Sequence, residues 1–387
     1  MAKTPETVMT FLADLRDRAF RHKSKEIDEL LSIKQTDLSS RGLPIESELY
    51  KWDRPYYTRL FKEKKYAVDN LKIAEYFPLH PVVTAMLKLF GDLFGFVFIE
   101  LKDDEDRAKI SPTGKASDLT WHEDVILYSV WNDDDAGGEF VGYLYLDLHP
   151  RPGKYGNAQC YGLQLGFSHP DGQRQYPSTV LITNFTKPTK EKPSLLHHNE
   201  LVMLFHELGH GMHDLSGRSQ YSRFHGAETV GDFNEAPSQM LENWCWDTAG
   251  LKLLSSHYKT GELLPDAMIE ALLRTKHTHA ALKLLGMLPV CLFDMAVHSA
   301  RAENGKVDVA KIYSDYVNLI GIKGPDDRLV SSSDQPIKSF FKAEIYADTG
   351  TPHIDICLMA MMLAFTAISG LTLMLWTYSI RRSNETQ

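Results

Sequence analysis

Residues 201–215 read LVMLFHELGHGMHDL, and the interpretation of the whole chain starts from this stretch. Its apolar residues recur every three or four positions, which predicts a helix with one buried stripe. The stripe consists of Leu201, Leu204, Phe205, Leu208, Met212 and Leu215. His206, Glu207 and His210 fall on another side of the same helix. Two imidazoles one turn apart can bind one metal ion, with the intervening glutamate beside a metal-bound water, so we predict a metal helix over about residues 199–216.

A catalytic zinc ion needs a third protein ligand, which has to come from another part of the chain. Asp214 is on the same helix, but it lies ~12 Å along the axis from His206 at ~1.5 Å rise per residue, too far to share one ion. We expect Asp214 either to face solvent or to contact one of the metal ligands without binding the ion itself. The longer HExxHxxGxxH pattern is excluded, because His213 and Ser216 stand where it requires glycine and histidine. The carboxylates that remain as candidate ligands are Glu228, Asp232, Glu235 and Glu242.

The segments around the metal helix indicate the fold class. β-Branched and aromatic residues predict strands upstream of it, over residues 94–99, 125–130, 140–148 and 179–185. The sequences DDDAGG and HPDG between these strands are typical of turns. Thr4 before Pro5 predicts the start of an N-terminal helix, and the pattern is helical again after Ser194. We therefore expect a mainly α protein with a small mixed β-sheet.

Composition excludes several classes of protein. The 387 residues are 43% hydrophobic and 11% aromatic, which is too apolar for a disordered chain. A net charge of -9 argues against nucleic-acid partners. The cysteines, Cys160, Cys245, Cys291 and Cys357, show no paired spacing, which indicates buried thiols in a reducing compartment. Since the N-terminus lacks the apolar core of a secretory signal, we expect a cytoplasmic location.

Several longer motifs follow one another along the chain. They are YKWDRPYY from Tyr50, YFPLHPVV from Tyr76, WHEDV from Trp121, YLDLHPRPGKYG from Tyr145, NFTKPT from Asn184, FHELGHGMH from Phe205 and NEAPSQMLENW from Asn234. With these motifs the chain resembles the thimet oligopeptidase, neurolysin and saccharolysin family of zinc oligopeptidases, from about Asp14 to about Gly321. The resemblance implies a zincin-type metallopeptidase catalytic region built round the HExxH helix.

The resemblance also implies the site residues. His206, His210 and Glu235 are expected to bind one zinc ion (Zn²⁺) per chain, and Glu207 is expected to activate water. Glu235 would begin a third-ligand helix over about residues 234–249, in which Pro237 is tolerated because it falls in the first turn. Short peptides are the implied substrates, mitochondria are an implied alternative to the cytoplasm, and we expect a monomer.

Other polar residues near the site have two interpretations each. Asp232 or Glu242 could accept a proton from the outer nitrogen of a ligand histidine, although ordinary helix-surface charge is the simpler interpretation. His213 either contacts a metal ligand without binding the ion or is a polar residue of a cleft wall. His197 and His198 lie just before the metal helix. We expect them to face solvent and to cap the start of that helix.

The chain also departs from the family pattern. The family is much longer, with a largely helical N-terminal portion that forms one wall of a deep channel, and that portion has no counterpart here. The family also has a His and a Gly-Tyr-rich motif near its C-terminus, and none follows Gly324, so neither Tyr346 nor Tyr378 is assigned a role. We therefore predict an incomplete peptidase catalytic region over residues 1–324.

Residues 325–387 form a divergent tail. Its uncharged stretch over residues 356–380 exceeds the ~20 residues needed to cross a bilayer. Trp376 and Tyr378, followed by Arg381, fit an interfacial belt, so a transmembrane anchor is one interpretation. The other is a tail foreign to this architecture, produced by a misassembled reading frame.

Two functions follow from the sequence. The first is a zinc-dependent metalloendopeptidase that hydrolyses short peptides, with Glu207 as the general base. The alternative is a catalytically impaired fragment of such a peptidase that binds zinc or peptide and is tethered to a membrane through residues 356–380.

Overall fold

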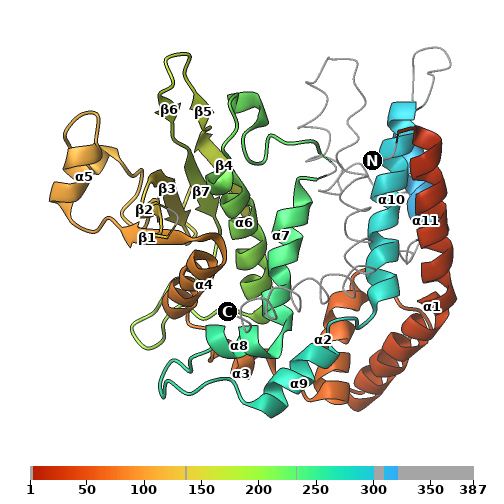
Figure 1. Ribbon diagram of the computed structural model, residues 1–387. Helices are drawn as coiled ribbons and strands as arrows, with labels where there is room; N and C mark the ends of the chain where they lie inside the picture. The colour runs from red at the N-terminus through yellow and green to blue at the C-terminus, as the bar shows by residue number, and fades with distance from the viewer. Residues whose placement is uncertain (1–2, 136, 232, 300–308, 321–387) are drawn as a thin grey trace, which may run out of the picture. The chain divides into compact units, whose positions relative to one another are not determined.

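A computed structural model of the chain describes residues 3–320, apart from residues 136, 232 and 300–308. The described residues form two compact units, whose elements are labelled in Figure 1. Among the described residues, the first unit contains those up to Ala67 and those from His277 to Ile320, and the second contains those of Val68–Lys276. The sequence predicted one region over residues 1–324. Each unit buries its apolar side chains in cores of its own, and the extent of the catalytic region stays a prediction.

The second unit contains a five-stranded sheet. In spatial order its strands are β1 (Phe96–Glu100), β2 (Ile126–Asn132), β3 (Phe140–Asp147), β7 (Ser178–Ile182) and β4 (Gln159–Gln164). β3 and β7 run parallel, and all other neighbouring strands are antiparallel. The predicted small mixed sheet is therefore confirmed. A separate hairpin pairs β5 (Phe167–Ser168) with β6 (Arg174–Gln175).

The four predicted strands correspond to β1, β2, β3 and β7, and both predicted turns join neighbouring strands. DDDAGG connects β2 to β3, and HPDG connects β5 to β6 through a hydrogen bond from the His169 N–H to the Gln173 carbonyl (2.7 Å). β4 was missed, because its sequence QCYGLQ contains no β-branched residue. Its register instead depends on pairing with β7, from which the β5–β6 hairpin separates it in the chain.

The second unit also contains several helices. They are α3 (Asn70–Ala74), α4 (Leu79–Phe94), α5 (Asp104–Ile110), α6 (His198–Ser216), α7 (Glu235–Glu242), α8 (Thr248–Leu254) and α9 (Asp266–Arg274), with short 3-10 segments η1 (Ala116–Asp118), η2 (Ser222–Phe224) and η3 (Asn243–Trp246). α6 packs on strands β3, β4 and β7 and also on α7 (Figure 1). The whole apolar stripe predicted for residues 201–215 is buried. The metal helix is thus held between sheet and helix.

Residues 234–249 were predicted as one helix, and the structure divides them. α7 ends at Glu242, and η3 follows it. The Asp247 carboxylate then accepts a hydrogen bond from the Gly250 N–H (3.1 Å) and caps the start of α8. Because Asp247 caps a new helix, residues 234–249 do not form one continuous helix.

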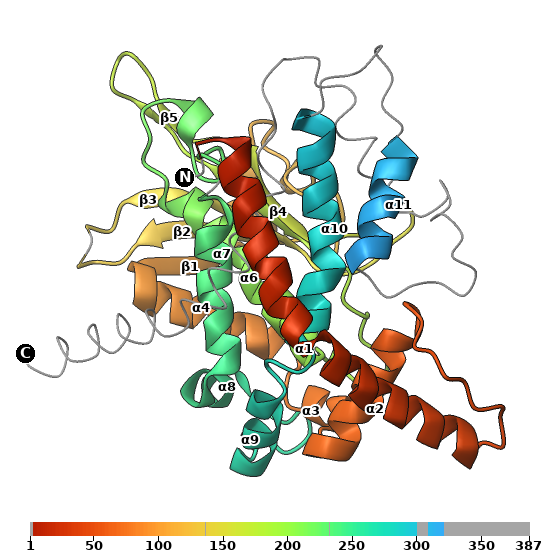
Figure 2. The same cartoon turned by 90° about the vertical axis from the view of Figure 1, so that its right-hand side faces the viewer.

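The first unit is helical. It contains α1 (Pro5–Ser40), α2 (Asp53–Tyr66), α10 (Ala280–Ser299) and α11 (Val309–Ile320). α1 starts as predicted, with the Thr4 side chain accepting a hydrogen bond from the Thr7 N–H. Its apolar stripe, including Val8, Leu12 and Leu15, packs against α10, which Figure 2 shows beside it. A later segment of the chain, α10, therefore covers the apolar stripe of α1.

One described helical segment, Ala280–His298 of α10, is long and apolar enough to span a membrane by length and composition. In the structure it is the core helix of the first unit, packed against α1. The apolar stretch 356–380 predicted as a membrane anchor lies outside the described residues, as does the rest of the tail 325–387.

Candidate metal centre

α6 presents His206 and His210 on the side that faces α7. Because the helix buries its apolar stripe, the two histidines one turn apart project together from another face. Their ring centroids lie 5.1 Å apart with the planes nearly perpendicular. Both side chains are partly buried, with exposed fractions of 21% and 11%.

Glu235, the first residue of α7, meets this pair. Its Oε2 lies 3.3 Å from Nε2 of His206 and 3.2 Å from Nε2 of His210. The three ligand atoms lie within 4.8 Å of one another, and among the described residues this is the one group of three that could hold a metal ion. Of the other candidate ligands, Glu228 is exposed and Asp232 lies outside the described residues.

A close helix crossing brings α7 to α6. A Cβ on Gly209 would lie 2.6 Å from the Cα of Ser238, so only a glycine permits this approach without displacement. The fully buried Ser238 donates a hydrogen bond to Oε2 of Glu235 (2.9 Å), which orients that carboxylate towards the histidines. The sequence reasoning gave neither residue a role, because both act only through a contact between helices.

Glu242, one of the two proposed partners of a ligand histidine, lies on the far side of His206. Its Oε1 is 2.7 Å from Nδ1 of His206, so the contact interpretation holds rather than the surface-charge one. In the neutral ring that binds a metal, Nδ1–H donating to Glu242 leaves the lone pair of Nε2 directed towards Glu235 and His210. Burial lowers the pKa of His206, but hydrogen bonds to Glu235 and Glu242 outweigh it and raise the pKa to about 10.

Glu207 lies between the two histidines in sequence and is partly buried. Burial raises the pKa of its carboxyl group, while nearby His206 and His210 and a hydrogen bond from the backbone of Cys160 act in the opposite direction. A carboxylate with a raised pKa is a better proton acceptor and donor near neutral pH than an exposed one.

The donor set fits zinc. Two imidazole nitrogens and one carboxylate oxygen are ligands that zinc prefers, and they leave room for a fourth. Burial raises the pKa of Glu235, but hydrogen bonds with His206 and His210 outweigh it, so the pKa is lowered and the group stays a carboxylate. Nδ1 of His210 is buried and has no hydrogen-bond partner among the described residues.

Three neighbouring histidines differ in their surroundings. His197 is the N-cap of α6, where its N–H donates to Glu200 (2.7 Å), as expected for capping. The prediction of solvated capping is wrong for His198, which is buried and lies 2.8 Å from the carbonyl of Cys245 through Nε2. The His213 ring packs edge-on against Phe233, and its Nδ1 has no hydrogen-bond partner within the described part of the chain.

Asp214 is buried rather than solvated, with 3% of its surface exposed. Oδ2 accepts a hydrogen bond from the hydroxyl of Thr179 on β7, and Oδ1 lies 3.3 Å from Nε2 of His225. Sequence reasoning missed Thr179 and His225, since no spacing pattern links a strand, a helix and a loop.

Comparison with known proteins shows which family the chain belongs to. The sequence model of Peptidase family M3 matches residues 1–347. The chain belongs to peptidase family M3. The family resemblance and the zincin-type fold predicted from the sequence are therefore confirmed, and the M3 match extends beyond Gly324 into the predicted tail.

Individual M3 proteins are similar to it over most of its length. Saccharolysin of Saccharomyces cerevisiae is 46% identical over 303 residues, which cover 78% of this chain and 41% of saccharolysin. Thimet-like oligopeptidase of Dictyostelium discoideum is 34% identical, over 79% of this chain and 44% of the relative. Oligopeptidase A of Escherichia coli is 31% identical, over 83% of this chain and 44% of the relative. The chain thus spans less than half the length of these M3 proteins.

Proposed function

We propose that this chain is a zinc-dependent metalloendopeptidase that hydrolyses short peptides. The observation that carries the proposal is the convergence of His206, His210 and Glu235 within 4.8 Å, with Glu207 on the same helix. Membership of family M3 and the oligopeptidase names of its relatives support the reaction class and the substrate class. A cytoplasmic monomer remains our prediction.

Different residues transfer the proton and orient the proposed ligands. A bound zinc ion would supply Lewis-acid polarisation of the scissile carbonyl and of the attacking water. Glu207 takes the proton of that water on its carboxylate and delivers it to the leaving amine. Glu242 holds the Nδ1 proton of His206, and Ser238 orients Glu235, so the three donor atoms converge before binding.

A second function is a binding fragment that does not turn over. The chain matches 41% of saccharolysin, so the assay has to distinguish this function from the peptidase. Such a chain would bind zinc through the same three residues and would not hydrolyse peptide.

One experiment separates these functions. Purified full-length chain is assayed for zinc content and for cleavage of a quenched short peptide, with and without a chelator. We expect one zinc ion per chain and cleavage that the chelator abolishes and added zinc restores. Zinc binding without cleavage would select the binding fragment, and no zinc in the wild-type protein would contradict both functions.

Variants assign the roles. Glu207→Gln should keep its zinc and lose at least ~10²-fold in rate, because the amide cannot accept the proton. His206→Ala should lose zinc, because two protein ligands remain. The exposed His169→Ala is the matched control and should retain both properties. Wild-type zinc content in His206→Ala would refute the ligand assignment.

A further inference from the structure

The segment between α6 and α7, residues 217–234, leads to the third proposed ligand, and its described residues, all but residue 232, contain little regular structure beyond η2. Fixing such a segment costs conformational entropy for every residue, so contacts elsewhere have to hold it in place. In its middle, His225 is fully buried, although Tyr221 and Phe224 just before it are more than 60% exposed. A buried polar ring directly after exposed residues indicates that the segment turns in against the protein at this point.

His225 packs against the metal helix, which is itself bonded to the sheet. Its Nε2 lies 3.3 Å from Oδ1 of Asp214 on α6. The other oxygen of Asp214 accepts the hydrogen bond from Thr179 on β7, and Thr179 is itself fully buried. Strand and helix are thus joined by a hydrogen bond, and the His225 ring, whose two nitrogens form no hydrogen bond among the described residues, is buried against the same carboxylate. We call Thr179, Asp214 and His225 the buried triad.

Glycines enclose the buried triad closely. A Cβ on Gly166 would lie 2.7 Å from Cε1 of His225, and one on Gly217 would lie 3.0 Å from the same atom. A Cβ on Gly226 would lie 2.6 Å from Cα of Asp214. At such distances any larger residue would displace the ring or the carboxylate. The ring therefore has one position available, and the segment is tied to it.

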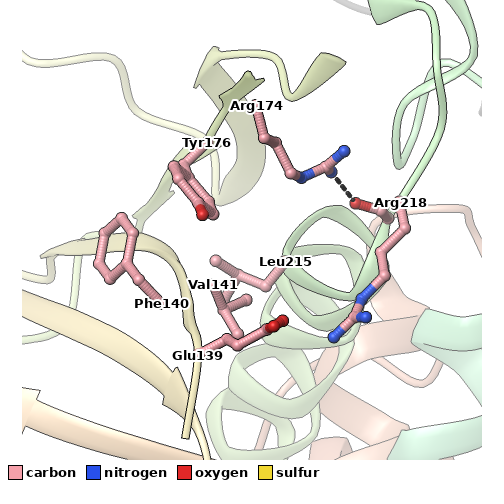
Figure 3. Close-up of a pocket in the computed structure, with 8 residues that line it drawn as sticks. Glu139, Phe140, Val141, Arg174, Tyr176, Leu215 and Arg218 are labelled. Carbon is pink, nitrogen blue, oxygen red and sulfur yellow. Dashed lines mark hydrogen bonds between the residues drawn. The ribbon is translucent and has the colours of Figure 1, made fainter. Parts of the chain in front are cut away.

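Arg174 of β6 attaches the beginning of the same segment. Its Nη2 donates to the carbonyl of Gly217 (2.7 Å), the bond drawn in Figure 3. Leu215, Tyr176 and Arg218 line the pocket of about 100 Å³ beside this bond. The hairpin thus holds the first residue of the segment, and the buried triad holds its middle.

We propose that Thr179, Asp214 and His225 are positioning residues, which hold segment 217–234 against the metal helix and thereby place Glu235 opposite His206 and His210. The placement of Glu235 as a ligand rests on the proposed function, whereas the attachment of the segment does not. The buried triad touches no proposed ligand atom, so its effect on the site acts through the path of the chain.

The first test measures the segment without metal. Hydrogen exchange of the amides in residues 217–231 is followed in chelator-treated full-length protein. Thr179→Val removes the hydroxyl donor at nearly constant shape, and His225→Ala removes the ring. Both should exchange about tenfold faster over this segment than the wild type, because a local attachment limits local opening.

Matched variants exclude a general loss of folding. Thr179→Ser keeps the hydroxyl and should exchange like the wild type. Phe224→Ala changes the exposed neighbour of His225 and should also leave exchange unaltered. Exchange in β2 and β3 serves as an internal reference, and it should be the same in all variants. Wild-type exchange of the segment in both Thr179→Val and His225→Ala would overturn the attachment.

The second test measures zinc affinity by competition with a chelator. Thr179→Val and His225→Ala should bind zinc about tenfold more weakly, while Thr179→Ser and Phe224→Ala bind it normally. Faster exchange with unchanged zinc affinity would overturn the positioning of Glu235. If the wild type binds no zinc, the proposed function fails, and the exchange measurement still decides whether the buried triad holds the segment.

Discussion

His206 lies between two carboxylates, and the outer one decides how its inner nitrogen is used. Glu242 accepts from Nδ1 at 2.7 Å, while Nε2 faces Glu235. A histidine ligand whose other nitrogen is held in this way has a defined tautomer and ring orientation. The sequence placed Glu242 among several acidic residues, and only the contact distinguishes it from surface charge.

Removing this outer contact should weaken the proposed metal site. We expect Glu242→Ala to bind zinc ~10–100-fold more weakly than the wild type, with Glu242→Gln between the two. The measurement is competition with a chelator of known affinity. Glu228→Ala, an exposed change in the preceding segment, is the control. Equal affinity in Glu242→Ala and the control would show that His206 needs no orienting partner.

Asp147, at the end of β3, carries a pH-dependent part of the stability. Burial raises its pKa, but bonds from Arg151, Lys154 and Trp121 outweigh this and lower the pKa to about 2. Arg151 binds both carboxylate oxygens, and the buried Lys154 binds one. Because the folded-state pKa is depressed, the stabilisation is complete above the ordinary pKa of 3.8 and is lost as pH falls towards 2.

We therefore expect Asp147 to contribute about 2 kcal/mol to the free energy of unfolding at pH 7, and little at pH 2. Asp147→Asn should be destabilised by about 3 kcal/mol at pH 7, because Arg151 and Lys154 lose their carboxylate. Urea denaturation followed by tryptophan fluorescence at several pH values measures this. The exposed Asp134→Asn should follow the wild type. A constant difference between Asp147→Asn and wild type at all pH values would contradict the prediction.

At the scale of elements, the metal helix α6 could be predicted from the sequence, whereas the position of its partner α7 could not. The 3.6-residue period of α6 is local, so its apolar stripe and its pair of histidines follow from the sequence alone. α7 is short, and the crossing at Gly209 and Ser238 positions it. That contact joins residues far apart in the chain, so no local pattern reveals it.

The crossing can be tested by adding one methyl group. Gly209→Ala places a Cβ 2.6 Å from the Cα of Ser238, so the two helices must separate. We expect a loss of about 2 kcal/mol in the free energy of unfolding. Zinc affinity should fall as well, since Glu235 moves with α7. Thermal denaturation and chelator competition measure the two effects, with the exposed Ser216→Ala as control. Wild-type zinc affinity would show that α7 tolerates displacement.

At the scale of the whole molecule, all proposed ligands belong to the second unit, Val68–Lys276. The M3 match ends at residue 347, before the uncharged stretch 356–380. The structure therefore assigns the proposed chemistry to a part of the chain that does not include the tail. Whether this stretch enters a bilayer stays a prediction.

Deleting residues 348–387 should increase the soluble yield, because a long uncharged segment exposes apolar surface in water. The zinc content should stay at that of the full chain, since His206, His210 and Glu235 are retained. Carbonate extraction of membranes from expressing cells, with both proteins compared, measures insertion. Release of the full-length chain into the soluble fraction would reject the membrane anchor. Loss of zinc on deletion would contradict the expectation that the zinc site does not depend on residues 348–387.

The sequence by itself determined the class of fold, the metal helix and the family resemblance. Each rests on patterns within short segments: the apolar period of residues 201–215, the strands rich in β-branched residues, and motifs in a constant order. From spacing alone the third ligand stayed open among four carboxylates, and the resemblance selected Glu235.

Only the tertiary structure decided which side chains meet. It brought Glu235 to the histidines, gave Glu242 a contact with His206, buried Asp214 against His225, and divided the described residues into two units. The physical reason is that each of these contacts joins separate elements, whose distance is set by packing density and by glycines that permit close approach. Local sequence patterns carry no information on such distances.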